Sequence, residues 1–408
     1  MPCFLAPPDS IAMVRRIMAA SSDTTPRNRP PLTWLILGER RGDNAQVLAL
    51  ARALGWPGAV KQIRYDDSVT VDFKDRGASL IGTDLALSDR LEPPWPEAII
   101  AIGRRSVPVT RWIREQAKAA GGEVLHIHLG RPRTDLGLFD LVVTTPQYNL
   151  PPAANVAEIS LPIVAVDSDE LAAAAGIWHP RFAALPRPWH AVLIGGPTPQ
   201  LAFGGTEAEH LAQELEAWHA GQGGSLLFTT SPRTPPEILA VLQGHFRNQP
   251  HQLFLPFVPD GRANAYPALL ALADDFVITI DSASMVAEAA TRRKPIYLFD
   301  LPTIAPRKKP GLKAALSRHW RLRRKRRQDA GLAPDLGDRL YDAWTRRGKA
   351  RPRRDIGQLM KRLTDTGIAV PMRGAPPPKP TDAGPSIAEQ EIAAVVARIQ
   401  QLWADRQG

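Results

Sequence analysis

The chain has 408 residues, of which 44% are hydrophobic and 23% charged, and its net charge is +10. This length exceeds what one hydrophobic core usually supports, so we expect two globular domains plus extensions. The single cysteine, Cys3, excludes an internal disulfide framework and favours the cytoplasm. No apolar run approaches the roughly 20 residues of a membrane span, and no Cys/His spacing is typical of a zinc site.

We expect residues 1–30 to form a disordered extension. Phe4-Leu5-Ala6-Pro7-Pro8 is too short and too rich in proline for the apolar core of a signal peptide. Met13 and Met18 are alternative candidates for the true start of the protein.

From residue 31 onwards, strand-like and helix-like segments alternate. The first group of predicted strands lies at residues 32–37, 98–102, 124–129 and 141–144. Helical stretches through Leu54 and Trp112 follow the first two strands. Such alternation predicts a parallel sheet with helices on both faces, in a first domain of residues 31–185.

A second group of strands follows the stiff Pro186-Arg187-Pro188 break. These strands are predicted at residues 191–194, 225–229, 253–257, 276–280 and 296–299. Pro256 weakens the third of them, because proline cannot donate to a strand ladder. The predicted fold class is therefore α/β with two Rossmann-like domains, the second spanning residues 186–306.

Phosphate-friendly residues follow three strands of the second domain. They form the turns Gly195-Gly196-Pro197-Thr198, Ser231-Pro232-Arg233-Thr234 and Ser282-Ala283-Ser284. In open α/β sheets, ligands bind beyond the carboxyl ends of the strands. A turn that opens a helix also points backbone N–H groups at one spot, which suits an anion. We therefore expect a phosphate-bearing ligand here, with ordinary helix capping by Ser and Asp as the alternative.

Positive charge is concentrated in one segment. Residues 307–354 contain 18 basic and 4 acidic residues, a net charge of +14, and the rest of the chain carries −4. We expect a basic helical segment over residues 307–370. A cluster of this kind is attracted to anionic lipid headgroups or to nucleic acid, and a solvated helix face is the third interpretation. No nucleic-acid-binding motif supports the second interpretation.

The last part of the chain predicts a linker and a helix. Residues 371–385 are rich in proline and typical of a linker. Ser386-Ile387-Ala388-Glu389 matches a capping box and opens a helix over residues 386–408. One face of this helix carries Ile392, Val395, Val396, Ile399, Leu402 and Trp403. We expect that face to pack onto the body of the protein, with a partner or a membrane as the alternative.

The first domain contains three further motifs, which we consider together with those of the second domain. Gly42-Asp43-Asn44-Ala45-Gln46 stands at the first strand–helix turn, Gly103-Arg104 follows a later strand, and the stretch 139–148 precedes a proline-rich loop. With the three turns of the second domain and Glu288, these motifs resemble the bacterial relatives of the plant mitochondrial-fission protein ELM1. This resemblance implies a glycosyltransferase with the two-Rossmann-domain architecture called GT-B. The resemblance spans roughly residues 32–305.

Two motifs depart from the pattern of that family. Asn264-Ala265-Tyr266 stands where the family often has Asn-Pro-Tyr. Gln147-Tyr148-Asn149 stands where many members have an acidic or His-containing sequence. Both departures bear on the identity of the acceptor.

The resemblance implies that the second domain binds a nucleoside-diphosphate sugar. Glu288, one helical turn after Ser284, would bind ribose hydroxyls. The residues implied around the diphosphate are Gly195, Gly196, Thr198, Ser231, Arg233, Ser282 and Ser284. Arg233 and the helix dipole would stabilise the leaving group without a metal ion, and no cofactor is expected. Asp167-Ser168-Asp169 has the look of a metal-binding Asp-x-Asp but belongs to an unrelated stretch.

The first domain would bind the acceptor. Asp43 is the candidate general base for the attacking hydroxyl, with capping of its own helix as the alternative role. The residues expected to line the same cleft are Gln46, Arg104, His128 and Arg133. His126 and His128 alternate on a strand, so we expect one of the two to face the cleft.

The sequence thus predicts a metal-independent glycosyltransferase that moves a sugar from a nucleoside diphosphate to a membrane-linked or envelope glycan. We expect it in the cytoplasm, peripherally on the inner face of the cell membrane. A non-catalytic membrane-associated scaffold with the same fold is one alternative. A nucleotide-sugar epimerase or other dinucleotide enzyme is another, but the chain has neither Gly-x-Gly-x-x-Gly nor Tyr-x-x-x-Lys. The fission role of plant members depends on an organelle and is not carried over.

Overall fold

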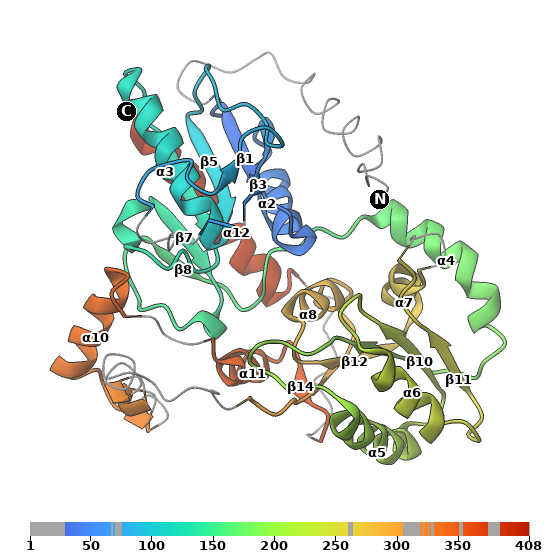
Figure 1. The fold of residues 1–408 in the computed structure, drawn as a ribbon. Helices are drawn as coiled ribbons and strands as arrows, with labels where there is room; N and C mark the ends of the chain where they lie inside the picture. Colours follow the sequence, from blue (N-terminus) through green and yellow to red (C-terminus); the bar gives the residue numbers. More distant parts are fainter. Residues whose placement is uncertain are drawn as a thin grey trace. The chain divides into compact units, whose positions relative to one another are not determined.

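The chain divides into two compact units, which the computed structural model places in separate contact groups (Figure 1). Unit 1 comprises Met1–Val143, Ala153–Ala157 and Ala393–Gly408, and unit 2 comprises Thr144–Pro152 and Glu158–Ile392. The structure describes residues 29–66, 68–69, 76–259, 264–304, 319–320, 322–324, 326–327, 330–350, 354–373 and 384–407. The expected N-terminal extension therefore lies outside the described residues, apart from its last two positions.

Unit 1 is built on a sheet with the strand order β2-β1-β5-β6-β7-β8, in which β2, β1, β5, β6 and β7 are parallel. Its strands are β1 Thr33–Leu37, β2 Gly58–Gln62, β5 Ala98–Ile102, β6 Leu125–Leu129, β7 Leu141–Thr144 and the edge strand β8 Val156–Glu158. The chain runs from β1 to β2 on one side and then to β5 on the other. The topological switch point, where such sheets bind ligands, therefore lies between β1 and β5.

Two helices of unit 1 begin at that switch point. Helix α2, Arg41–Leu54, follows β1, and helix α3, Gly103–Ala119, follows β5 directly. Gly103 has a φ of 76°, which lets the chain turn from the strand into the helix without the strain that a side chain would cause. A two-stranded antiparallel ribbon, β3 Arg64–Tyr65 and β4 Thr83–Asp84, stands apart from the main sheet.

Unit 2 contains a fully parallel sheet with the strand order β11-β10-β9-β12-β13-β14. Its strands are β9 Trp189–Ile194, β10 Ser225–Thr230, β11 Gln252–Leu255, β12 Asp275–Thr279, β13 Ile296–Phe299 and β14 Val370–Pro371. The switch point of this sheet lies between β9 and β12. The predicted fold class, α/β with two Rossmann-like domains, is confirmed.

Four helices of unit 2 pack against one another in two pairs. Helix α5 lies along α6, and α4 lies along α7 (Figure 1). The helices of this unit are α4 Ser168–Phe182, α5 Gly205–Gln222, α6 Pro236–His245, α7 Tyr266–Leu272, α8 Ala283–Ala290, α10 Leu336–Arg346 and α11 Ile356–Asp365. The buried aromatic side chains of Phe228, Phe246 and Phe276 lie in one continuous core.

All nine predicted strands are present, each within two residues of its expected ends. Strand β11 ends at Leu255, directly before Pro256, because proline has no N–H to continue the ladder. The sequence did not predict β2, β8 or β14, each of which lies at an edge of a main sheet, nor the two short strands β3 and β4. Edge strands are only half covered, so they lack the continuous apolar run that marks the central strands.

The predicted domain boundary at residues 185 and 186 is wrong, because the chain leaves unit 1 earlier. Residues 158–185 belong to unit 2. Leu161, Leu171 and Phe182 are buried in the core of that unit, and α4 packs along α7. The Pro186-Arg187-Pro188 break therefore separates a helix from the first strand of the same unit and does not separate two domains.

The basic segment also differs from its prediction in two ways, where it falls among the described residues. Its end is not a separate helical segment, because Ile356, Leu359 and Leu363 of α11 are buried in the core of unit 2. Part of its charge is neutralised as well. Ion pairs join Arg323 to Asp335, Arg324 to Asp342 and Arg327 to Asp338. Most of the predicted linker over residues 371–385 lies outside the described residues.

The predicted C-terminal helix is present as α12, Ile387–Gln407. Ser386 and Glu389 form the expected capping box, with each side chain accepting from the backbone N–H of the other residue. The face carrying Val395 and Ile399 is buried, and the indole of Trp403 contacts Trp56 at 6.3 Å between ring centroids. The apolar face therefore packs onto the protein, as expected. Across the described residues, we find no helix with the length and hydrophobicity to cross a bilayer.

The position of α11 can be tested with one pair of substitutions. Leu359 is fully buried, whereas Leu340 on α10 is 54% exposed. Leu359→Ala should destabilise the protein by about 2–5 kcal/mol, because it leaves a cavity in the core. Leu340→Ala should change the stability by less than about 0.5 kcal/mol. Thermal melting of both variants checks this, and equal melting temperatures would contradict the placement of α11 in the core.

Candidate functional site

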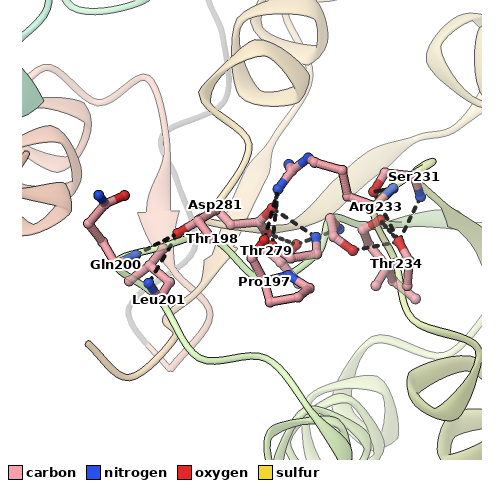
Figure 2. Close-up of polar contacts among 12 residues, drawn as sticks. Pro197, Thr198, Gln200, Leu201, Ser231, Arg233, Thr234, Thr279 and Asp281 are labelled. Atoms are coloured by element: carbon pink, nitrogen blue, oxygen red, sulfur yellow. Dashed lines mark hydrogen bonds and ion pairs between the residues drawn. The ribbon is translucent and has the colours of Figure 1, made fainter. Parts of the chain in front are cut away.

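The polar turns of unit 2 meet at the switch point between β9 and β12, around the buried carboxylate of Asp281 (Figure 2). One Asp281 oxygen accepts from the backbone N–H of Gly196 and from Nη2 of Arg233, each at 2.9 Å. The other accepts from the hydroxyl of Thr279 at 2.7 Å. The carboxylate is thus both hydrogen-bonded and ion-paired, as a buried charge has to be.

Gly195 and Gly196 are required by this packing. A Cβ at Gly195 would lie 2.1 Å from an Asp281 oxygen, and a Cβ at Gly196 would lie 2.3 Å from the carbonyl oxygen of Arg233. The N–H of Gly195 donates to the Thr279 hydroxyl at 2.8 Å. The N–H groups of both glycines are therefore already bonded within the protein, and the glycines shape the turn instead of pointing free donors outward.

Arg233 is the cation of this cluster. Its side chain is 46% exposed, although one edge is fixed by Asp281 and by the carbonyl oxygen of Gly196 at 3.2 Å. The hydroxyl of Ser231 accepts from the Arg233 backbone N–H at 3.2 Å and contacts the Thr234 hydroxyl at 3.0 Å. The guanidinium group is therefore held in place while part of it faces solvent.

Thr198 has a local role. Its hydroxyl accepts from the backbone N–H groups of Gln200 at 3.3 Å and Leu201 at 3.0 Å (Figure 2). Such bonds stabilise the turn after β9. Thr198 and Ser231 thus help to form the turns around the cluster.

Helix α8 begins directly beyond Asp281. Ser282 is its N-cap residue, but the Ser282 side chain makes no capping hydrogen bond. Within the part of the chain that the structure describes, neither the Ser282 nor the Ser284 hydroxyl makes a hydrogen bond. The first turn of α8 carries no acidic residue that would offset its partial positive charge. Two hydroxyls and a helix start are therefore available beside Asp281.

Glu288 lies one turn further along α8 and accepts a hydrogen bond from the hydroxyl of Tyr266. Tyr266 belongs to the Asn264-Ala265-Tyr266 motif and begins α7. Burial raises the pKa of Glu288, and the negative charge of Glu170 adds to this, while the Tyr266 hydrogen bond opposes it. A hydrogen bond thus joins the Asn264-Ala265-Tyr266 motif to Glu288, two features that the sequence did not connect.

Unit 1 has a second candidate site, a pocket at its own switch point between β1 and β5. Its polar lining residues are Glu39, Arg40, Asp43, Asn44, Tyr65, Arg104 and Arg105. The side chain of Asn44 accepts from the backbone N–H of Gly38 at 2.9 Å and donates to the Gly38 carbonyl oxygen at 2.8 Å. Asn44 therefore stabilises the turn after β1, and the Asp43 side chain takes no part in these hydrogen bonds.

Asp43 does not cap its helix. The N-cap residue of α2 is Arg40, and no side chain caps this helix start. The Asp43 carboxylate makes no hydrogen bond or ion pair within the described residues. Burial raises its pKa, an effect that the nearby Arg40 partly opposes. An unpaired carboxyl group with a raised pKa in a pocket can act as a general base.

Of the other residues predicted around Asp43, only Arg104 lines its pocket. The side chain of Gln46 donates to the carbonyl oxygen of Gly42 at 3.3 Å, one turn back in its own helix. Arg133 is exposed and has a left-handed backbone with a φ of 61°. Neither residue contributes to the pocket lining.

The prediction for the two histidines is wrong. Residues two apart on a strand point to the same face, so His126 and His128 cannot face opposite ways. Both are fully buried, and their rings lie 4.7 Å and 4.9 Å from the ring of Phe139. Burial lowers the pKa of His128 to about 3, so this side chain is neutral at physiological pH. Both histidines are core residues.

Asp167 and Asp169 form a helix start. Asp167 is the N-cap of α4, and its carboxylate accepts from the backbone N–H groups of Asp169 at 2.9 Å and Glu170 at 3.2 Å. The Asp-x-Asp pattern is therefore explained by capping. Among the residues that the structure describes, no group of three or more His, Cys, Asp or Glu side chains could hold a metal ion.

Sequence reasoning did not single out several residues of the two sites. Asp281 lay inside a motif that had been noticed, but its role follows only from contacts with β9 and β10. Arg40 and Arg105 stand next to recognised motifs, so their position in the sequence could have predicted that they line the pocket. Tyr65 lies in the two-residue strand β3, which has no pattern of its own.

Comparison with known proteins places the chain in a family. The family model described as Mitochondrial fission ELM1 matches residues 41–342. The chain belongs to this family. It is 29% identical over 231 residues to mitochondrial fission protein ELM1 of Arabidopsis thaliana. That match covers 51% of this chain and 52% of the relative, so it spans about half the length of each protein.

Comparison with solved structures finds similar chains at low identity and low TM-score. UDP-GlcNAc 2-epimerase from Methanocaldococcus jannaschii is 11% identical with a TM-score of 0.42, covering 90% of this chain and 99% of that one. Arabidopsis thaliana UGT89C1 complexed with UDP-L-rhamnose is 12% identical with a TM-score of 0.41, covering 91% and 100%. Similarity at this level does not bear on the ligand of the ELM1-family chain, so its function has to be argued from its own residues.

The state of Asp43 leads to a pH-dependent prediction. Its raised pKa means that the folded protein binds this proton more tightly than the unfolded chain does. Above the folded-state pKa, the ionised Asp43 carboxylate therefore makes the folded protein less stable than it would be with a neutral side chain at this position. Asp43→Asn should raise the melting temperature at pH 8, and the difference should shrink as the pH falls towards the unfolded value of about 3.9.

Melting curves of both proteins between pH 4 and pH 8 check this prediction. A lower melting temperature of Asp43→Asn at pH 8 would contradict it, because that result would mean that the charged carboxylate stabilises the folded state.

Proposed function

We propose that this protein is a GT-B glycosyltransferase that transfers a sugar from a nucleoside-diphosphate donor to a hydroxyl group of an acceptor. The observation that carries the proposal is the switch point of unit 2. There the half-exposed Arg233 and the two available hydroxyls of Ser282 and Ser284 surround the start of α8. Guanidinium groups, hydroxyls and a helix N-terminus are the groups that proteins use to bind phosphate.

The Asp281 pair supports an anionic ligand at this place. A carboxylate beside a phosphate would repel it, but the charge of Asp281 is already bonded to Arg233, Gly196 and Thr279. The same pair fixes the orientation of the guanidinium before a ligand arrives. Preorganised donors of this kind stabilise charge well, because no reorganisation is needed when the charge develops.

Glu288 supports a nucleotide as the carrier of that phosphate. It lies one turn beyond Ser284, and only one of its two oxygens is engaged by Tyr266. The other oxygen can accept a hydrogen bond from a ribose hydroxyl. We propose this role for Glu288 and a diphosphate-binding role for Ser282, Ser284 and Arg233.

In the proposed reaction, an acceptor oxygen forms a bond to the anomeric carbon of the sugar. The bond from that carbon to the diphosphate oxygen breaks, and its electron pair leaves with the nucleoside diphosphate. The acceptor proton passes to Asp43, which has no competing partner among the described residues. Arg233 and the dipole of α8 stabilise the leaving group, and we propose that they do so without a metal ion.

The acceptor is proposed to be a membrane-linked or envelope glycan, reached at the cytoplasmic face of the membrane. The support for this is the net charge of +14 over residues 307–354, which would attract an anionic lipid surface. The ion pairs of Arg323, Arg324 and Arg327 reduce this attraction, since these three charges are already compensated.

A thermal-shift screen tests the proposal. The purified protein is heated with UDP, GDP, CMP, ADP or NAD in the presence of EDTA. A ligand at 100 times its Kd should stabilise the folded state by about 2.7 kcal/mol and raise the melting temperature. We expect this for one nucleoside diphosphate, and we expect Arg233→Gln and Glu288→Ala to remove the effect.

Arg187→Gln is the matched control for Arg233→Gln. Arg187 also pairs with an aspartate of unit 2, Asp274, but this pair precedes β9 and β12 at the opposite edge of the sheet. It should keep the full ligand-induced shift. No shift with any nucleotide would contradict the proposal and favour a scaffold, and a shift with NAD alone would favour a dinucleotide enzyme.

A further inference from the structure

Helix α10 exposes its apolar face and buries its acidic face. Leu336, Leu340 and Trp344 follow one another at intervals of four residues, so they lie on one side of the helix. They are 73%, 54% and 48% exposed, and together they form what we call the apolar stripe. A helix at the surface of a globular protein normally turns its apolar residues towards the core. An exposed stripe of this kind marks an interaction surface.

Ion pairs hold α10 in this orientation. Asp338 and Asp342 lie on the buried side of the helix. Nε of Arg327 lies 3.1 Å from an Asp338 oxygen, and Nη1 of Arg324 lies 2.9 Å from an Asp342 oxygen. Turning the helix to bury its leucines would break these pairs and leave the charged groups without their partners, which is costly. The fold therefore keeps the apolar stripe facing outward.

Unpaired positive charges stand beside the apolar stripe. The remaining acidic residue, the N-cap Asp335, pairs with Arg323, so all three aspartates of the helix and its cap have basic partners. Arg339 lies within α10 and Arg347 directly follows it. Both are exposed, and neither side chain makes a hydrogen bond or ion pair within the described residues. Leucine and tryptophan next to arginine are typical of helices that lie in the interface of an anionic bilayer.

We propose that α10 lies on an anionic lipid membrane, with the apolar stripe inserted between the headgroups and with Arg339 and Arg347 bound to their negative charges. Burial of the apolar side chains and attraction of the cations both favour this arrangement. A second copy of this chain suits the surface less well, because a symmetric interface would bring the same arginines towards each other.

The choice of a membrane as the partner rests on the proposed function, in which the acceptor is membrane-linked. The apolar stripe and its arginines are features of α10 itself. The inference also divides the basic segment by task. Arg323, Arg324 and Arg327 hold α10 in place through ion pairs, and the apolar stripe contacts the lipid. Because salt screens only the charges, binding should persist in part at high ionic strength.

Co-sedimentation of the full-length protein with vesicles of phosphatidylcholine and phosphatidylglycerol in equal parts tests the proposal. Leu340→Ser should weaken vesicle binding by about 10-fold, the loss expected when a buried leucine is removed. Arg339→Gln should weaken it by about fivefold, and should have no effect on vesicles of phosphatidylcholine alone. Ile177→Ser is the matched control, because Ile177 is similarly exposed but belongs to α4. It should leave vesicle binding unchanged.

The fluorescence of Trp344 gives an independent measure of insertion. The emission of the wild-type protein should shift to shorter wavelength when vesicles are added. Trp344→Phe keeps an apolar side chain, so it should still bind the vesicles, but this shift should be lost. The comparison is needed because the chain contains ten tryptophans. A shift of the same size in Trp344→Phe would contradict the insertion of α10.

The outcomes separate this inference from the proposed function. If the wild type does not bind vesicles, or if Leu340→Ser binds them equally well, the inference is overturned. A dimer that Leu340→Ser dissociates, without vesicle binding, would overturn it in favour of a second copy. Nucleotide binding in the thermal-shift screen without vesicle binding leaves the glycosyltransferase standing. Vesicle binding that depends on Leu340, without nucleotide binding, supports the inference and contradicts the glycosyltransferase.

Discussion

The buried carboxylate of Asp281 is the interaction on which the candidate donor site depends. It bonds to groups from the turns after β9 and β10 and to Thr279 at the end of β12, so it joins the carboxyl ends of three strands. Because an unpaired buried charge is costly, Asp281 keeps the guanidinium of Arg233 beside it. The same packing leaves no room for a side chain at Gly195. One ion pair thus explains the glycines and the orientation of the arginine.

Both units place their candidate site at the switch point of a parallel sheet, but the acidic residue of the site is paired in one unit and, among the described residues, unpaired in the other. In each unit the candidate site lies where strand order reverses, beside a helix that starts at the carboxyl end of a strand. In unit 2 the acid is fully paired and its cation, Arg233, is partly exposed, which suits binding of an anion. In unit 1 the acid, Asp43, makes no hydrogen bond or ion pair within the described residues, and burial raises its pKa, which suits proton transfer. Two acids in different environments can thus serve two different tasks.

The sequence was sufficient for the central strands and for the turns at their carboxyl ends, because long apolar runs and the Gly/Ser turns after them are local signals. It was not sufficient where a role depends on contacts between distant segments. The domain boundary was misplaced because α4 packs on α7, a contact that no local pattern indicates. The two buried histidines were misread by ignoring the two-residue period of a strand.

The central claim is that unit 2 binds the diphosphate of a nucleotide around Arg233 and the start of α8. A crystal structure of the protein with the best-binding nucleoside diphosphate tests this claim most directly. We predict diphosphate oxygens within hydrogen-bonding distance of the Arg233 guanidinium and of the Ser282 or Ser284 hydroxyl, with Asp281 still paired to Arg233. Diphosphate bound anywhere else, for example in the pocket of Asp43, would contradict the claim.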